Sequence, residues 1–222
     1  MKEKNIIMNK KTGLVKRYLF LLIGLFIMAF GVAFSIKAGL GTSPISSVPY
    51  VLSEVTPLTV GNITIIMHCC FIIMQIIILR RNYKAVQLLQ LVVAFVFGYM
   101  TDFAVWVLSP LKCENYGMAW VLCIIGIVLV AVGVSFEVTA NVVTLAGEGL
   151  VLAICQVVPI KFGTMKVTFD VSLVVIACIL SVVFLHGLYG VREGTIAAAV
   201  FVGTISRKIN KPLGQKFNTM LG

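Results

Sequence analysis

The sequence predicts an all-α, polytopic helical membrane protein with about six transmembrane helices, two short broken or re-entrant helices and an inverted internal repeat. The first observation is composition: 60% of the residues are hydrophobic, the mean hydropathy is +1.08 and only 12% are charged. Charged residues make up about 25% of soluble domains, so most of the chain is expected to lie in lipid. The second observation is a series of long apolar runs, and the third is a repeat, which is typical of transporter-like folds.

The two halves of the chain align when the sequence is shifted by about one hundred residues. Residues 23–77 then match residues 125–179 without a gap. Several matched pairs are residues that set backbone shape: Gly24 with Gly126, Gly31 with Gly133, Pro57 with Pro159 and Gly61 with Gly163. One membrane unit is therefore predicted to occur twice.

Six apolar runs approach the roughly 20 residues that a membrane-spanning helix needs. They are residues 18–36, 62–79, 85–108, 119–136, 167–185 and, less cleanly, 195–205. The first run is too long for the apolar part of a secretory signal and lacks a cleavage site, so it is predicted to be retained. The predicted organisation is a basic tail (1–17), a first membrane repeat (18–108), an external loop (109–118), a second membrane repeat (119–206) and a second basic tail (207–222).

The net charge of +10 arises from basic residues that cluster between the apolar runs and at the termini. Lysine and arginine are retained on the cytoplasmic side of membranes, so this distribution predicts orientation and gives no reason to expect a nucleic-acid partner. With both termini cytoplasmic, all but three of the 18 basic residues lie inside; the exceptions are Lys37, Lys112 and Arg192.

This orientation requires residues 39–56 to enter and leave the membrane from the same face. Pro44 and Pro49 are expected to interrupt the segment, and the helix after Pro44 is about 12 residues, too short to cross. Each copy then crosses three times, so the second copy is inverted, with residues 141–159 as the counterpart segment. In the alternative threading both short segments cross, which gives eight spans and parallel repeats and places Arg81 outside.

The first candidate site is the turn that begins at Gly39 and leads into the short helix at Pro44. Broken backbone at membrane depth is tolerated where a cavity satisfies it, and a helix beginning there would direct its positive dipole end at that cavity. Its hydroxyl-bearing side chains are Thr42, Ser43, Ser46 and Ser47. This arrangement predicts a small polar or anionic ligand; the alternative is an outer loop capped by Ser43.

The second copy places different side chains at the equivalent positions. Thr144 is kept, Asn141 replaces Gly39 and Glu148 replaces Ser46. Ionisable groups in a bilayer cost roughly 3 kcal/mol or more, so Glu148 is predicted to line a cavity.

Further polar residues interrupt the apolar runs. Asp170 coincides in the repeat with His68, and Lys166 precedes it by one helical turn and is placed to neutralise it. Asp170 and Glu148 are predicted to be functional, and His68 and Thr195 are added as candidates. Glu137, at the end of its run, is interpreted as a membrane-boundary residue.

Neither an enzyme nor a cofactor site is predicted. The six cysteines show no paired metal spacing and are interpreted as buried small hydrophobic residues. The sequence has no recognisable cluster of nucleophile, base and carboxylate.

Three sequence motifs resemble those of the bacterial YczE-type membrane proteins, which are related to the YitT-type proteins. They are Gly39-x-Gly-Thr-Ser-Pro with its following serines, Gly61-Asn62, and Gly194-Thr195 with Gly203. The family usually has an earlier glycine in the last motif, where this chain has Arg192. The resemblance implies a multi-pass plasma-membrane protein of a little-characterised, transporter-like family.

Together these observations predict a secondary permease for a small molecule, which works by alternating access around the two broken segments. Protonation of Asp170 or Glu148 is the predicted coupling step. Two alternatives remain: the substrate-binding membrane component of a vitamin importer with an ATPase partner, for which Gly24 and Gly31 would supply the contact, and a non-transporting sensor or scaffold. Lipid and a second copy of the chain are the other expected partners.

Overall fold

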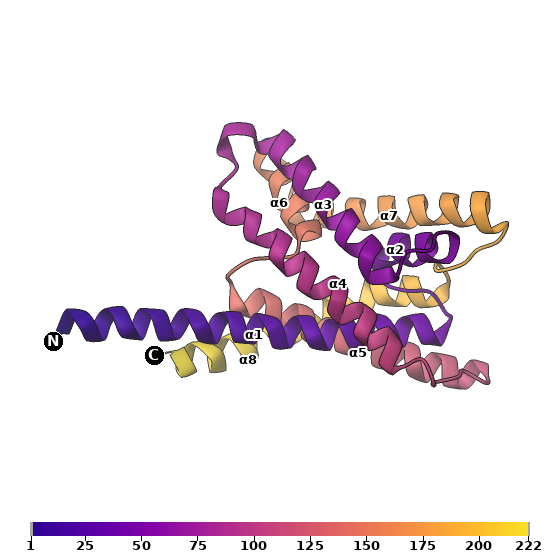
Figure 1. The fold of residues 1–222 in the computed structure, drawn as a ribbon, viewed down its shortest axis with the longest axis horizontal. Helices are drawn as coiled ribbons and strands as arrows, with labels where there is room; N and C mark the ends of the chain where they lie inside the picture. Colours follow the sequence, from indigo (N-terminus) through magenta and orange to yellow (C-terminus); the bar gives the residue numbers. More distant parts are fainter. Residues whose placement is uncertain (1, 222) are drawn as a thin grey trace.

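The computed structural model describes residues 2–221, with side chains over residues 13–210 and 212–214. The described secondary structure is helical (Figure 1). The long helices are α1 (Lys2–Ala38), α3 (Val60–Leu79), α4 (Leu89–Val107), α5 (Tyr116–Ala140), α7 (Phe162–Leu185) and α8 (Glu193–Leu221). The short elements are α2 (Pro44–Val55), α6 (Ala146–Val157) and the 3₁₀ turns η1 (Arg80–Asn82) and η2 (Ala85–Leu88).

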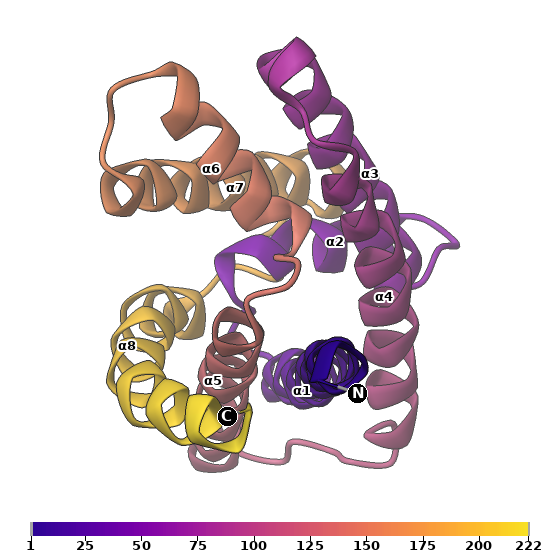
Figure 2. The ribbon, with the colours of Figure 1, turned by 90° about the vertical axis from the view of Figure 1, so that its left-hand side faces the viewer.

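α1 and α5 form an antiparallel pair, with α4 on the α1 side and α8 on the α5 side (Figure 2). A Cβ added at Gly24 would lie 3.0 Å from Gly133 O, and one added at Gly31 would lie 2.9 Å from Gly126 O. Residue numbers rise along α1 as they fall along α5, so the helices run in opposite directions. The repeated glycines therefore pack against one another, as the small-residue interpretation predicts for helices in lipid.

The other helices pack in a way that is largely the same for both halves. α4 packs on α1 as α8 packs on α5, and α2 packs on α7 as α6 packs on α3. Each short helix thus contacts a long helix of the other half. Because of this exchange, the two halves interlock and share their cores (Figures 1 and 2).

One contact is present in the first half only. α3 and α4 pack as a hairpin, whereas α7 and α8 do not pack along each other over the described residues. A Cβ at Gly61 would overlap Gly98 O, but the counterparts Gly163 and Gly203 have no atom of another segment within 4 Å of an added Cβ. The α7–α8 pair of the second half is therefore open where the α3–α4 pair is closed.

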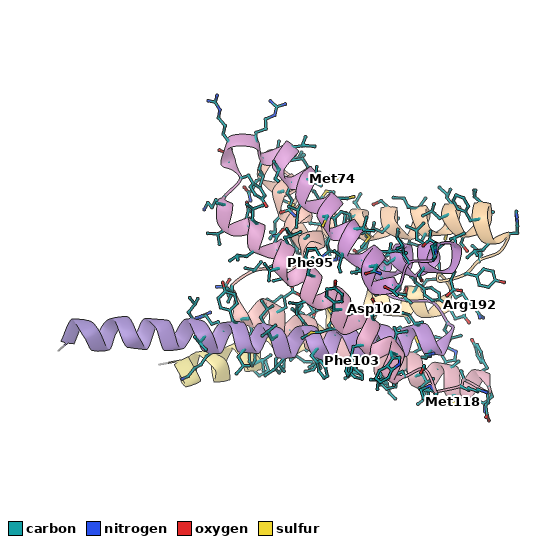
Figure 3. All side chains as sticks on the ribbon, viewed as in Figure 1. Met74, Phe95, Asp102, Phe103, Met118 and Arg192 are labelled. Atoms are coloured by element: carbon teal, nitrogen blue, oxygen red, sulfur yellow. The ribbon has the colours of Figure 1, made fainter. Side chains whose placement is uncertain are left out.

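Asp102 fastens the closed hairpin (Figure 3). Thr59 Oγ1 donates to Asp102 Oδ2 at 2.6 Å, and Gly61 N donates to Oδ1 at 2.7 Å. A carboxylate here satisfies an amide at the start of α3 and opposes the positive end of its dipole. In the repeat alignment, Lys161 and Arg207 occupy the positions of Thr59 and Asp102, so two positive charges replace this hydroxyl–carboxylate pair.

The predicted all-α, polytopic class is confirmed. Within the part of the chain that the structure describes, five helical segments are long and apolar enough to cross a membrane by length and composition: 13–38, 60–82, 85–107, 116–140 and 162–185. The sixth predicted span lies at the start of α8, which continues into basic sequence after residue 205 and is not one of the five.

The two short helices lie where the sequence predicts broken segments. Each has 12 residues, about 18 Å of helix, which is too short to cross the hydrocarbon core. α2 begins at Pro44 as expected, but Pro49 lies inside the helix and does not end it. A proline removes a single main-chain hydrogen bond, and the packing of Val48 and Val51 against α7 holds the helix together around it.

The prediction that the cysteines are buried is correct for some of them only. Cys123 is buried, but Cys70 on α3 and Cys113 in the α4–α5 loop are exposed. All six are free thiols.

Candidate functional site

The structure distributes the ten predicted site residues over four places. The first is the turn from α1 into α2 together with the start of α8: Thr42, Ser43, Ser46, Ser47 and Thr195. The second is a cavity at the end of α5, lined by Asn141 and Thr144. The third is a charged group on α6 and α7 that contains Glu148 and Asp170, and the fourth is the core position of His68.

The first place is closed, and we call it the sealed junction. Gly39 and Gly41 have φ of 67° and 94°, a left-handed conformation that favours glycine and lets the chain turn back towards α8. Thr42 is 1% exposed, and its Oγ1 has no partner among the described residues. Three hydrogen bonds close the junction: Thr42 N to Gly190 O (3.1 Å), Gly194 N to Leu40 O (2.8 Å) and Arg192 Nη1 to Gly39 O (3.2 Å; Figure 3).

The repeat counterpart of the sealed junction holds a cavity of about 290 Å³. It lies between η2, the start of α4, the end of α5 and α6. Asn141 has φ of 48°, so the backbone turns here with the same handedness as at Gly39. The polar side chains that line the cavity are Gln87, Gln90, Glu137, Asn141, Thr144 and Gln156. The turn after α1 is thus closed by hydrogen bonds, whereas the equivalent turn after α5 borders a cavity.

Glu137 is the most deeply buried ionisable side chain of the cavity lining, at 1% exposed. Its Oε1 accepts from Leu145 N at 2.6 Å, which places the carboxylate at the N-terminus of α6. Its Oε2 has no hydrogen-bond partner among the described residues. A buried carboxylate oxygen without a partner is costly, so this oxygen needs a proton or a ligand.

Two glutamines lie beside the cavity. Gln75 Nε2 donates to Gln90 Oε1 at 3.0 Å and to Ala146 O at 3.1 Å, while Gln75 Oε1 has no partner among the described residues. A Cβ added at Gly149 would lie 2.5 Å from Gln90 Nε2. Gly149 therefore leaves the space that the two amides occupy, and Gln75 supplies a second unpartnered acceptor.

The third place is a group of charges that connects with Glu137. Lys166 Nζ lies 2.6 Å from Asp170 Oδ1, which confirms the predicted pair one turn apart. Glu148 is partly exposed and lies in electrostatic range of both, and Glu137 is in range of Glu148 and Lys166. Glu148 and Asp170, the two carboxylates that the sequence predicts to be functional, thus belong to one group of charges, and this group includes Glu137 in the cavity wall.

His68 lies apart from the cavity lining. Its ring is 1% exposed and packs between Phe71 and Phe97, with centroids 6.0 and 6.3 Å away. Its Nδ1 has no partner among the described side chains. The repeat alignment with Asp170 therefore does not give the two side chains similar surroundings.

Glu137, Gln75 and Gln90 lie in or beside the cavity but are not among the residues that the sequence selects. The sequence predicts Glu137 at a membrane boundary, whereas the turn after α5 buries it beside the start of α6. Gln75 and Gln90 are single polar residues in apolar runs. Their position in such runs is the signal that would have selected them, since unpaired amides are costly in lipid.

This architecture defines a polytopic helical membrane protein with a polar cavity between its two halves. The chain belongs to a family of unknown function, DUF6198, whose model matches residues 15–211. It is 30% identical over 200 residues to the uncharacterized membrane protein YczE of Bacillus subtilis (strain 168), which covers 89% of this chain and 86% of that protein. The predicted YczE-type resemblance is thereby confirmed.

A second relative is the uncharacterized protein YyaS of the same organism, 31% identical over 118 residues. That match covers 53% of this chain and 57% of YyaS, so the chain matches little more than half the length of that relative. No solved structure matches the chain significantly.

Proposed function

We propose that the protein is a small-molecule permease of the bacterial plasma membrane, which works by alternating access between two inverted repeats. The observation that carries the proposal is the pair of equivalent turns, of which one is sealed by three hydrogen bonds and the other opens into a cavity. A carrier needs a site that is closed on one side of the membrane while it is open on the other.

The antiparallel contact of α1 and α5 supports the inverted arrangement. Both helices are long and apolar enough to cross, and they are counterparts in the repeat. If both cross, antiparallel packing means that the two halves enter the membrane in opposite senses. With the basic termini inside, the sealed junction faces outwards and the cavity faces the cytoplasm.

The difference between the two hairpins fits the same mechanism. In an inverted-repeat carrier the two halves exchange conformations, so the state open to one side is the mirror of the state open to the other. Here α3 and α4 are closed and α7 and α8 are apart. The proposed second state has α7 closed on α8 near Gly163 and Gly203, and α3 separated from α4 near Gly61 and Asp102.

Protonation of Glu148 or Asp170 is the proposed coupling step. Asp170 already pairs with Lys166 at 2.6 Å, so a proton on Asp170 would release a cation into the group. Glu148 lies at the first turn of α6, next to the cavity wall. A proton on either group changes the charge that the cavity presents.

The vitamin-importer alternative has less support. It uses Gly24 and Gly31 as a contact surface for another subunit. Both glycines are in contact with α5 of the same chain, so this surface is already covered.

The test is the accessibility of two engineered cysteines in a cysteine-free background. Thr42→Cys reports on the sealed junction from outside, and Val138→Cys reports on the cavity from inside. Asp102→Ala removes the fastening of the α3–α4 hairpin. We expect that variant to increase labelling of Cys at 42 by an impermeant maleimide several-fold and to decrease labelling of Cys at 138.

The control is Glu114→Gln, which removes an exposed carboxylate of the α4–α5 loop. It should leave the labelling rates of the cysteines at positions 42 and 138 unchanged. Increased labelling at both positions in the Asp102→Ala variant would indicate a loosened fold and would contradict alternating access. Unchanged labelling at both positions would contradict the proposed role of the hairpin.

A further inference from the structure

The geometry points to a small organic cation, an ammonium group on a short apolar body, as the ligand of the cavity at the end of α5. The inference rests on the proposed function, because it names the ligand class of the same cavity. It is carried by the 1% exposed carboxylate of Glu137, whose Oε2 has no hydrogen-bond partner among the described residues.

Acceptors without a partner among the described residues lie in the cavity wall and directly behind it. Glu137, which lines the cavity, has its buried Oε2 free of such a partner. Gln75 lies behind Gln90 of the lining; its Oε1 also has no partner among the described residues, while its Nε2 donates to Gln90 and Ala146. An ammonium group has three donors and no acceptor, so it matches unpartnered acceptors. A hydrogen bond between an ammonium and a carboxylate is also among the strong ones in proteins.

The charge around the cavity has the matching sign. Three carboxylates and one lysine in and next to the cavity wall interact electrostatically: Glu137, Glu148, Asp170 and Lys166. With its carboxylates ionised, this group carries more negative than positive charge, which favours a cationic ligand over an anionic one.

An anionic ligand fits this cavity poorly. The N-terminus of α6 would attract an anion through its dipole, but Glu137 Oε1 already occupies Leu145 N at 2.6 Å. An anion would therefore approach a carboxylate. The predicted polar or anionic ligand concerns the hydroxyl groups of the sealed junction, which are those of Thr42, Ser43, Ser46 and Ser47.

The size and walls of the cavity favour an organic cation over a bare metal ion. Its volume of about 290 Å³ far exceeds the roughly 10–15 Å³ that a cavity needs to hold one water molecule. The lining also has five apolar side chains: Val86, Val138, Val142, Val143 and Leu152. A metal ion would leave those walls without contacts, whereas an alkyl chain fills them.

The experiment is a thermal-shift titration of the purified full chain in detergent. The probes are n-butylammonium chloride, sodium butyrate, n-butanol and sodium chloride, with ionic strength held constant. A ligand that binds only the folded state raises the Tm. We expect a saturable rise with n-butylammonium alone, and binding weakened about tenfold or more in Glu137→Gln.

The matched control is Glu114→Gln, which should bind like the wild type. Gln75→Leu, which removes the second acceptor, tests the site again if Glu137→Gln does not fold. An equal shift with sodium chloride, a shift with butyrate or butanol, or unaltered binding in a folded Glu137→Gln or Gln75→Leu variant would overturn the inference. The titration needs no transport, so a negative result here with intact alternation of cysteine labelling would reject the ligand class and leave the permease standing.

Discussion

At the scale of single residues, equivalent positions of the repeat have acquired different chemistry. Glu137 aligns with Ser35, whose hydroxyl donates to Gly31 O of its own helix. Thr195 aligns with Gln90; the threonine lies at the sealed junction and the glutamine beside the cavity. At these two positions the packing of the helices is repeated while the polar side chains differ, so the two halves present different chemistry at equivalent places.

The clearest residue-scale prediction concerns two equivalent glycines. Gly61→Ala places a Cβ onto Gly98 O and the Asp102 carboxyl, so it should destabilise the fold by about 1–3 kcal/mol and lower the Tm by several degrees. Gly163→Ala meets no atom of another segment within 4 Å and should cost nothing, since alanine is the better helix former. Thermal unfolding of both purified variants measures the difference.

Equal effects of the two alanines would contradict the open arrangement of α7 and α8. A larger loss at Gly163 would mean that this position is the packed one.

At the scale of helices, the α1–α5 contact organises the molecule. Phe20 stacks on Phe136 with ring centroids 4.2 Å apart, continuing the contact made by the glycines. Lipid provides no hydrophobic force between apolar helices, so their association depends on close packing and on hydrogen bonds. Glycine at four repeated positions permits that approach. The α1–α5 pair is therefore the main packing contact between the two halves.

Gly133→Leu tests this element. An added Cβ there would already lie 2.6 Å from Gly24 O and 2.7 Å from Met28 Cβ, so a leucine side chain forces the helices apart. We expect loss of monodisperse, folded protein in size-exclusion chromatography, because overpacking alone costs about 1–3 kcal/mol or more.

The matched variant is Gly203→Leu on α8, where an added Cβ meets no atom of another segment within 4 Å. It should yield protein like the wild type. Folded Gly133→Leu protein in normal amounts would show that the helices do not pack through this face.

At the scale of the whole molecule, the number of membrane crossings in each half determines which side of the membrane the sealed junction and the cavity would face. The inverted threading places Arg81 inside and the α4–α5 loop outside, whereas the eight-span threading with parallel repeats reverses both. The loop carries the exposed native thiol Cys113. An impermeant maleimide on intact cells should label Cys113, kept as the only cysteine, and should not label Arg81→Cys in a cysteine-free chain.

Leu188→Cys in the α7–α8 loop serves as the control, since both threadings place it outside. Strong labelling of Arg81→Cys together with protection of Cys113 would exclude inverted repeats and with them the proposed mechanism.

The sequence by itself determined the class of the protein, the duplicated unit and the two short helices. Composition and apolar length are sums over many residues, and a repeat is visible without any contact between its copies. It also predicted the Lys166–Asp170 pair, because residues four apart on a helix meet whatever surrounds them.

Only the tertiary structure decided which turn is sealed, which holds a cavity, and that Glu137 lies buried inside the wall. These properties depend on contacts between residues far apart in the chain, such as Gln75 with Ala146 and Thr42 with Gly190. Both turns begin with a residue of positive φ, Gly39 and Asn141, so this shared feature does not distinguish open from closed. That difference arises from the packing of α3 on α4 and the separation of α7 from α8, which the pattern of apolar residues leaves undetermined.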